Sequence, residues 1–263
     1  MPVGSVIVVS GLGYEQIGNG AERIVLLHGF TQSRDVWRSV AEHVVAHLPT
    51  AHCLLVDLPG HGASSEISAD LTTAARLVTE LCGSSIYVGY SLGGRVVLQA
   101  TIEHPDAVRR AVVVSATAGI DDADERRERA TADDALAERL ERIGIDAFLD
   151  EWLAQPIFRD LPFDAAQLAT RRKNTVTGLA DSLRRCSQGR QQSLWHALAH
   201  ARQPLLAIAG SRDAKYVALA RRLATVAPHG ALRIVDGAGH SVVLERPSDL
   251  AAEIVYWITN PSA

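Results

Sequence analysis

Short apolar runs rich in β-branched residues alternate with longer segments of helical spacing along most of this chain. The runs are Val6–Ser10, Arg23–His28, Ala51–Asp57, Ser85–Gly89, Arg110–Ser115, Pro204–Gly210 and Ala231–Asp236. Helices fit between them at about 34–47, 70–82, 92–104, 215–227 and 248–259. Continuous apolar runs of this length, separated by helices, are typical of parallel strands buried on both faces. We therefore predict an α/β fold with a mostly parallel sheet and helices on both faces.

One long segment, residues 119–201, interrupts this alternation. It is rich in Ala, Arg, Glu and Leu, has helical spacing and contains no clear strand. Asp121–Arg142 reads as one long charged helix, and Gly144–Gln155 reads as another that the next proline ends. We expect an all-helical cap over residues 119–201, inserted into a core formed by residues 1–118 and 202–263.

Composition and charge limit the partners of the chain. Its 263 residues carry a net charge of −4, which gives no sign of nucleic-acid or acidic-membrane binding. No apolar run approaches the roughly 20 residues that span a bilayer. The N-terminus lacks the basic start of a signal peptide, and three cysteines without metal-ligand spacing favour free thiols in a reducing compartment. We expect a cytoplasmic protein that uses neither metal nor organic cofactor; its oligomeric state is not readable from the sequence.

The pentapeptide Gly89–Gly93 reads Gly-Tyr-Ser-Leu-Gly and matches the nucleophile-elbow pattern G-x-S-x-G. A predicted strand precedes it and a predicted helix follows, so the sharp turn would expose Ser91 at the edge of the sheet. The glycines allow strand and helix to pass closely, and the helix N-terminus favours negative charge that develops at Ser91. We therefore predict that Ser91 is the reactive residue of an α/β-hydrolase fold.

Two backbone N–H groups are expected to stabilise negative charge beside Ser91. In this fold one donor belongs to the residue after the serine, and the other comes from a loop after an earlier strand. These positions are Leu92 and Phe30, the latter in the sequence His28-Gly29-Phe30. We predict that both N–H groups form the oxyanion hole.

A serine hydroxyl needs a histidine to take its proton, and a carboxylate commonly orients that histidine. His240 follows the last predicted strand, and Asp213 follows the strand before it, which gives the chain order Ser-Asp-His of this fold. The rivals for the carboxylate are Asp57, Asp236 and an acid after Ser115. We predict His240 as the base and Asp213 as its partner.

Further motifs in the chain resemble one family, the 2-succinyl-6-hydroxy-2,4-cyclohexadiene-1-carboxylate synthases, which are lyases of menaquinone (vitamin K2) biosynthesis. The core motifs are Leu27–Thr31, Trp37, Asp57–Gly62, Gly89–Arg95 and Asp213–Tyr216. The motifs in the predicted cap are Glu125-Arg126, Arg129, Asp133, Trp152, Gln155–Phe158, Gly178–Ala180 and Ser193–Trp195. The core motifs up to Gly93 are shared by many α/β-hydrolases, whereas the cap motifs are the specific part.

The resemblance implies an elimination rather than a hydrolysis. Ser91, activated by His240, would abstract a proton from a polycarboxylate substrate, and pyruvate would leave. The resemblance also implies that three arginines bind substrate carboxylates and that two aromatic residues line the pocket. These residues are Arg95, Arg129, Arg171, Tyr90 and Trp152.

Read without the resemblance, the arginines have ordinary explanations. Arg95 lies one helical turn after Ser91, where it could equally pair with a structural acid. Arg129 lies in a charge run of the kind usually found on solvated helix faces. Either member of the Arg171-Arg172 pair could point inward. Trp152 in a helical stripe could equally be a packing residue.

Two short segments depart from the family pattern. Ser187–Gln192 replaces the usual Gly-Thr-Gly-x-Gln-Pro, and Ser211 stands where an acidic residue is common. The same predicted triad would also suit a carboxylesterase or carbon–carbon-bond hydrolase that uses Ser91 as an acyl nucleophile. A non-catalytic ligand-binding protein of this fold is a third reading, but such a protein would not need the triad.

Overall fold

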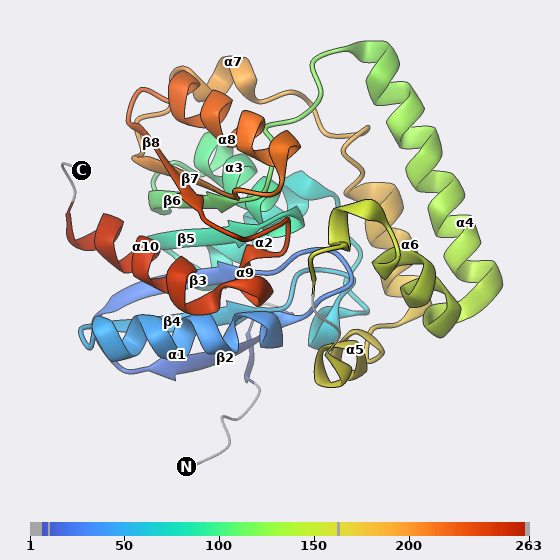
Figure 1. Ribbon diagram of the computed structural model, residues 1–263, viewed down its shortest axis with the longest axis horizontal. Helices are drawn as coiled ribbons and strands as arrows, with labels where there is room; N and C mark the ends of the chain where they lie inside the picture. Colours follow the sequence, from blue (N-terminus) through green and yellow to red (C-terminus); the bar gives the residue numbers. More distant parts are fainter. Residues whose placement is uncertain (1–6, 10, 162–163, 261–263) are drawn as a thin grey trace.

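The computed structural model describes residues 7–9, 11–161 and 164–260. Its strands form one eight-stranded sheet in the order β1-β2-β4-β3-β5-β6-β7-β8 (Figure 1). The strands are β1 Ile7–Val9, β2 Leu12–Gly18, β3 Glu22–Leu27, β4 Ala51–Val56, β5 Ser85–Tyr90, β6 Val108–Val114, β7 Leu205–Gly210 and β8 Gly230–Val235. β2 is antiparallel to both of its neighbours, and β3 to β8 are parallel.

The predicted α/β fold is confirmed, with one strand that the apolar runs do not reveal. β2 mixes polar residues and glycines in the sequence Leu-Gly-Tyr-Glu-Gln-Ile-Gly, and most of it is only half-buried. A strand next to the sheet edge has one partly solvated face, so it needs no continuous apolar run. Val6 and Ser10, at the ends of the first predicted strand, lie outside the described residues.

Helices cover both faces of the sheet. α1 (Arg38–His47) and α10 (Pro247–Thr259) lie on one face, whereas α2 (Leu71–Cys82), α3 (Leu92–Glu103) and α8 (Ala214–Val226) lie on the other (Figure 1). Successive side chains of a strand point to opposite faces, and β3 therefore contributes to two cores. Val25 and Leu27 join the cluster under α2 and α3, while Ile24 and Leu26 join the cluster under α1.

The described chain between β6 and β7 is largely helical, and most of it lies to one side of the sheet (Figure 1). We call three of its helices, α4 (Ala123–Leu153), α5 (Ala165–Arg171) and α6 (Val176–Arg185), the cap helices. α7 (Trp195–Leu198) then leads into β7. The cap helices have a core of their own, formed by Ala137, Leu140, Phe148, Leu179, Ala180 and Leu183.

α4 contains a break at Gly144, where φ is 77° and ψ is 174°. This conformation is non-helical, so α4 consists of two helical parts that meet at the glycine. The sequence predicts two helices with the second starting at Gly144, and the structure agrees. Within the described part of the chain, every helix is too short or too polar to cross a membrane.

Candidate active site

Ser91 lies in the turn between β5 and α3, with φ of 53° and ψ of −107°. A side chain at either flanking glycine would collide with backbone. A Cβ at Gly89 would lie 2.2 Å from the carbonyl oxygen of Gly93, and one at Gly93 would lie 2.1 Å from that of Leu27. The strained turn and the two close approaches have the geometry of a nucleophile elbow.

Ser91, His240 and Asp213 lie together at the carboxyl ends of β5, β8 and β7. His240 Nε2 is 3.4 Å from Ser91 Oγ, and His240 Nδ1 is 2.9 Å from Asp213 Oδ2. The carboxylate can only accept, so Nδ1 carries a proton and Nε2 is left to take the proton of Ser91. The Ser–His separation is long for a hydrogen bond, as is common in catalytic sites without a ligand.

The rival carboxylates have other partners. Asp57 is fully buried and forms an ion pair with Arg34, and Asp236 accepts a hydrogen bond from Ser211. Asp213 also accepts a hydrogen bond from the N–H of Tyr216 at the start of α8, which fixes its carboxylate. Of these three carboxylates, Asp213 is the one that forms a hydrogen bond with His240.

Aromatic rings pack around His240. Tyr216 lies closest, with a ring-centroid distance of 4.5 Å, and the ring of Tyr90 lies at 5.5 Å. Phe158, from the segment that follows α4, approaches the third side at 6.2 Å. Sequence reasoning missed Tyr216 and Phe158 as neighbours of the histidine. The signal for Tyr216 was its place three residues after Asp213, in the first turn of the same helix.

The loop that follows β3 places Phe30 beside Ser91. Both Phe30 and Leu92 line the same cavity as Ser91. The N–H of Leu92 is in the first turn of α3, where helix geometry supplies no intrahelical acceptor. Among the described residues, neither this N–H nor that of Phe30 has a hydrogen-bond partner. Two residues of the cavity wall around Ser91 therefore have a backbone N–H without a partner among the described residues.

A cavity of about 600 Å³ opens beside Ser91 and His240. The basic residues of its wall are Arg95, Arg129, Arg159, Arg171, Arg212 and Lys215, and the acidic ones are Asp133, Asp160 and Asp213. Every one of these acids already has a partner in the protein, namely Arg129 for Asp133, Arg159 and Arg212 for Asp160, and His240 for Asp213. The wall therefore has an excess of positive charge that suits an anionic ligand.

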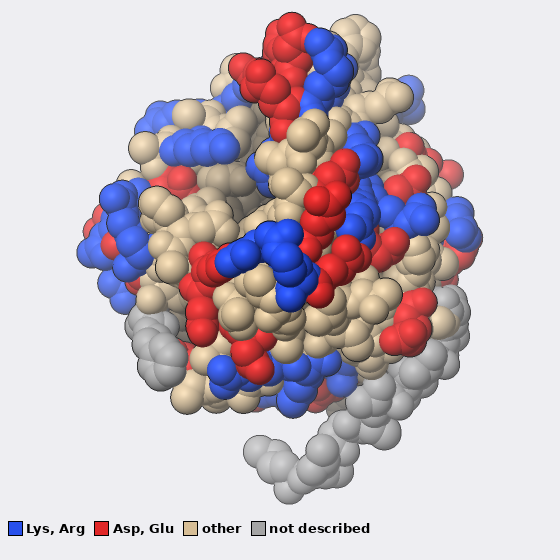
Figure 2. Space-filling model, turned by 90° about the vertical axis from the view of Figure 1, so that its right-hand side faces the viewer, with Lys and Arg blue, Asp and Glu red and all other residues tan. Residues whose placement is uncertain are grey.

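The outer surface of the cap side differs from the cavity. Basic and acidic side chains are interspersed over it, and this view shows no single basic patch (Figure 2). The charges there are largely paired, for example Arg139 with Glu151 and Arg184 with Glu141. The excess of positive charge is therefore a property of the cavity.

Two of the predicted arginines are buried in the cavity wall without an acidic partner among the described residues. Arg95 is 7% exposed and donates to the carbonyl oxygen of Cys186 at 2.6 Å and to Gln191 Oε1 at 3.2 Å. Arg171 is 2% exposed and donates to the hydroxyl of Thr31, while its Nη2 has no partner. Burial lowers the pKa of Arg171 to about 10, so it stays charged at neutral pH.

The other arginines behave differently. Arg129 is partly exposed and pairs with Asp133 at 2.9 Å, and Ser187 donates to the second oxygen of that carboxylate at 2.6 Å. Arg172 pairs with Asp146 on the surface, so Arg171 is the member of the adjacent pair that points inward. The segment that departs from the family pattern, Ser187–Gln192, thus supports both Asp133 and Arg95.

Trp152 and Tyr90 both line the cavity. Trp152 stacks on Phe148, with ring centroids 6.0 Å apart, and meets Phe30 edge-on at 5.1 Å. Tyr90 is buried, and its hydroxyl shares a 3.0 Å hydrogen bond with that of Ser241. Trp152 therefore serves both the packing of the cap helices and the wall of the cavity.

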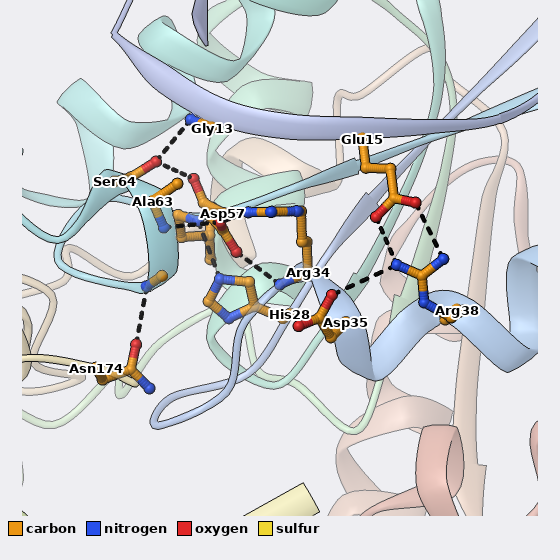
Figure 3. A network of polar contacts seen from close by, with 12 residues as sticks. Gly13, Glu15, His28, Arg34, Asp35, Arg38, Asp57, Ala63, Ser64 and Asn174 are labelled. Carbon is orange, nitrogen blue, oxygen red and sulfur yellow. Dashed lines mark hydrogen bonds and ion pairs between the residues drawn. The ribbon is translucent and has the colours of Figure 1, made fainter. Parts of the chain in front are cut away.

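The loops behind the site are fastened by a buried polar network (Figure 3). Asp57 accepts hydrogen bonds from the backbone N–H and guanidinium of Arg34 and from the N–H of Ala63. His28 Nε2 accepts from the N–H of Leu58 at 3.0 Å. Asp57 thus joins the loop after β3 to the loop after β4, because its buried carboxylate accepts hydrogen bonds from both.

Comparison with known proteins identifies the family to which this fold belongs. The model of the alpha/beta hydrolase family matches residues 24–253. The chain belongs to this family. Within it, the chain is 33% identical to the 2-succinyl-6-hydroxy-2,4-cyclohexadiene-1-carboxylate synthase of Klebsiella pneumoniae, over 87% of this chain and 90% of that one. It is 31% identical to the synthase of the same name from Serratia proteamaculans, over 90% and 93%.

Solved structures of alpha/beta hydrolases agree with this placement. The structure of MenH from S. aureus superposes with a TM-score of 0.86 and 25% identity, covering 95% of this chain and 99% of that one. A thermophilic esterase from Thermogutta terrifontis shares the fold, with a TM-score of 0.82, 21% identity and coverage of 96% and 94%. The chain is thus an alpha/beta hydrolase that belongs with the 2-succinyl-6-hydroxy-2,4-cyclohexadiene-1-carboxylate synthases.

The described residues offer no cluster of three or more His, Cys, Asp or Glu side chains suited to a metal ion. All three cysteines are buried and free, and burial raises the pKa of Cys186, which touches the cavity, to about 11. A thiol with so high a pKa is a poor nucleophile at neutral pH. Ser91 is therefore the better nucleophile or base at this cavity.

Proposed function

We propose that this protein is a lyase that removes pyruvate from a succinyl-enolpyruvyl-hydroxycyclohexene-carboxylate, giving 2-succinyl-6-hydroxy-2,4-cyclohexadiene-1-carboxylate. The observation that carries the proposal is a serine triad facing a cavity with two buried arginines that have no acidic partner in the described part of the chain. Arginine suits a carboxylate because its planar donors can bind both oxygens. The names of the similar synthases supply the identity of the polycarboxylate.

In the proposed reaction, Ser91 acts as a base rather than as an acyl nucleophile. His240 Nε2 takes the proton of Ser91, and Ser91 Oγ removes a proton from the carbon next to the substrate ketone. The electron pair passes through the ring as the bond to the enolpyruvyl oxygen breaks. Enolpyruvate leaves and takes up the proton held by His240, which restores the neutral imidazole, and it then tautomerises to pyruvate. The Phe30 and Leu92 N–H groups would stabilise the charge that spreads onto the ketone oxygen. Asp213 would hold the imidazole in the required tautomer.

The cap helices would complete the binding site. We propose that Arg95, Arg129 and Arg171 bind the carboxylates of the substrate, and that Tyr90 and Trp152 line the pocket. Arg129 and Arg171 belong to α4 and α5, so a cap spanning residues 119–201 would supply two of the three cations to a core formed by residues 1–118 and 202–263. A closed cap also keeps water from the carbanion.

The test is pyruvate release from the enzymatically generated precursor, followed with a lactate dehydrogenase coupling assay. We expect turnover well above the spontaneous rate, and a loss on the order of 10³-fold or more in Ser91→Ala. Simple carboxylic esters serve as the comparison substrate. Pyruvate at only the spontaneous rate, together with good turnover of the esters, would replace the lyase by a hydrolase that acylates Ser91.

A further inference from the structure

The loop that carries the Phe30 N–H contains an unfavourable backbone conformation. Residues 29–32 form a turn in which the N–H of Gln32 donates to the carbonyl oxygen of Gly29 at 3.2 Å. Thr31, the third residue of this turn, has a φ of 64°. That position in a turn with positive φ favours glycine, and a β-branched residue is strained there. Something outside the turn must therefore hold Thr31.

Two contacts hold Thr31, and both come from the segment between β6 and β7. Arg171, at the end of α5, donates to the Thr31 hydroxyl. Asn174, which follows α5, donates to the Thr31 carbonyl oxygen at 2.8 Å. All three residues are buried. The side chain oxygen of Asn174 is itself fixed, because it accepts from the N–H of Gly62 at 2.9 Å (Figure 3).

We propose that Thr31 is a positioning residue through which this helical segment sets the direction of the Phe30 N–H. The Phe30 N–H belongs to the same four-residue turn as Thr31. Because the hydrogen bond from Gln32 to Gly29 ties the ends of this turn together, a change of the backbone angles at Thr31 would alter the direction of the Phe30 N–H. Arg171 also lines the cavity, and its buried Nη2 has no hydrogen-bond partner in the part of the chain that the structure describes. An anion bound there would keep Arg171 against Thr31 and so keep the donor aligned. This inference rests on the proposed function in one respect, the assignment of the Phe30 N–H as an oxyanion donor.

The first pair of variants separates the hydroxyl from the shape of the side chain. Thr31→Val removes the acceptor for Arg171 and keeps the β-branch, whereas Thr31→Ser keeps the hydroxyl. Two rates are measured for each: pyruvate release, resolved into kcat and KM, and phosphonylation of Ser91 by a fluorophosphonate probe. In the second reaction Ser91 Oγ displaces fluoride from phosphorus, and the phosphoryl oxygen uses the same backbone donors.

We expect Thr31→Val to lower kcat and the phosphonylation rate by on the order of 10- to 100-fold, because a displaced donor weakens oxyanion stabilisation. Thr31→Ser should recover most of both rates. An unchanged phosphonylation rate in Thr31→Val, or a change in KM alone, would overturn the proposal, since Thr31 would then act only through substrate binding.

A second set of variants covers the case in which Thr31→Val does not fold. Asn174→Ala removes the contact to the Thr31 carbonyl and should lower both rates. In a Thr31→Gly background its effect should shrink to less than about twofold, because glycine adopts positive φ without help. Equal effects of Asn174→Ala in the two backgrounds would contradict the proposal.

The two reactions also keep the proposals apart. Wild-type protein that is phosphonylated normally but releases no pyruvate above the spontaneous rate would remove the lyase assignment. A drop in phosphonylation in Thr31→Val and its recovery in Thr31→Ser would still support the positioning role of Thr31.

Discussion

Arg171 carries a charge into the cavity wall at a place where no acid among the described residues balances it. The side chain is almost fully buried, and one of its nitrogens has no partner. A buried charge without a counterion destabilises a fold, because the charge has lost its hydration. Such a residue is retained when its binding partner is a ligand, which restores the missing interactions.

Replacing the Arg171 guanidinium should change activity much more than stability. In Arg171→Met we expect kcat/KM for pyruvate release to fall by on the order of 100-fold, about 3 kcal/mol. The free energy of unfolding should stay within about 1 kcal/mol of the wild-type value, because removing an unbalanced buried charge offsets the loss of the hydrogen bond to Thr31. Steady-state kinetics and urea unfolding measure the two effects.

The neighbouring residue supplies a matched control. Arg172 pairs with Asp146 on the surface, and exposed pairs contribute little. Arg172→Met should change neither kcat/KM nor the free energy of unfolding appreciably. A parallel loss of activity in both variants would contradict the assignment of Arg171 as the inward-facing cation.

At the residue scale, the sequence predicted side chains whose position follows from backbone connectivity. Ser91 is placed by an elbow motif, and Asp213 and His240 are placed by the ends of adjacent parallel strands. The arginines were different, because their direction depends on how the cap helices pack. Thr31 and Asn174 could not be predicted, since positive φ and a contact between residues 143 positions apart leave no local sequence signal.

Among the elements, α4 decides how the cap reaches the cavity. Its second part, after Gly144, carries Phe148 and Trp152, which pack against each other and against Phe30. A Cβ at Gly144 would meet no atom within 4 Å, so the glycine is needed for its backbone conformation rather than for space. The break therefore sets the angle at which Trp152 enters the cavity.

Gly144→Ala should disturb this angle. The conformation at Gly144 is nearly restricted to glycine, so alanine should cost about 1–3 kcal/mol or pull the two parts of α4 into one continuous helix. A continuous helix would withdraw Trp152 from the wall, so we expect KM for the substrate to rise several-fold. Thermal unfolding and steady-state kinetics measure the two consequences.

Gly83 offers a control with the same backbone problem far from the site. It has φ of 58° and ψ of −154°, and a Cβ there would also meet no atom within 4 Å. It lies just before the N-terminal end of β5, whereas Ser91 follows the C-terminal end of this strand. Gly83→Ala should lower stability by a similar amount and leave KM unchanged. A KM change in both variants would mean that general destabilisation, not α4, is responsible.

The elements themselves were predicted unevenly. Six apolar runs matched the parallel strands β3 to β8, because buried parallel strands need apolar residues on both faces. β2 escaped notice because a strand with one solvated side shows a weaker pattern. α5 and α6 were not distinguished as separate helices within the segment that the sequence predicts to be all-helical. The break in α4 was visible because a glycine within a helical pattern is a strong local signal.

At the scale of the whole molecule, two buried histidines make the free energy of unfolding depend on pH. Burial lowers the pKa of His28 to about 4 and that of His61 to about 3, from an ordinary value of 6.5. In the unfolded chain these imidazoles take up protons as the pH falls below about 6.5, whereas the folded protein keeps them neutral to about pH 4. The unfolded state then binds more protons, so the free energy of unfolding decreases as the pH falls.

We expect the free energy of unfolding to drop by on the order of 3 kcal/mol for each of these two groups between pH 7 and pH 4, or about 6 kcal/mol together. Urea unfolding at a series of pH values measures it. His61→Gln, which cannot titrate, should have a shallower pH dependence than the wild type. His47→Gln, which changes an exposed histidine at the end of α1, is the control and should keep the wild-type dependence. An unaltered slope in His61→Gln would contradict this assignment.

The unbalanced arginines of the cavity also bear on how a catalytic cycle ends. In the proposed reaction one polyanion enters, and its carboxylates leave on two separate molecules. Neither product can bind all the guanidinium groups that bound the substrate, so each product binds more weakly than the substrate. Cleavage of the bond to the enolpyruvyl oxygen divides the anionic charge between two products and so lowers the affinity of the cavity for each of them. The same cavity can therefore bind its substrate tightly and still release its products quickly.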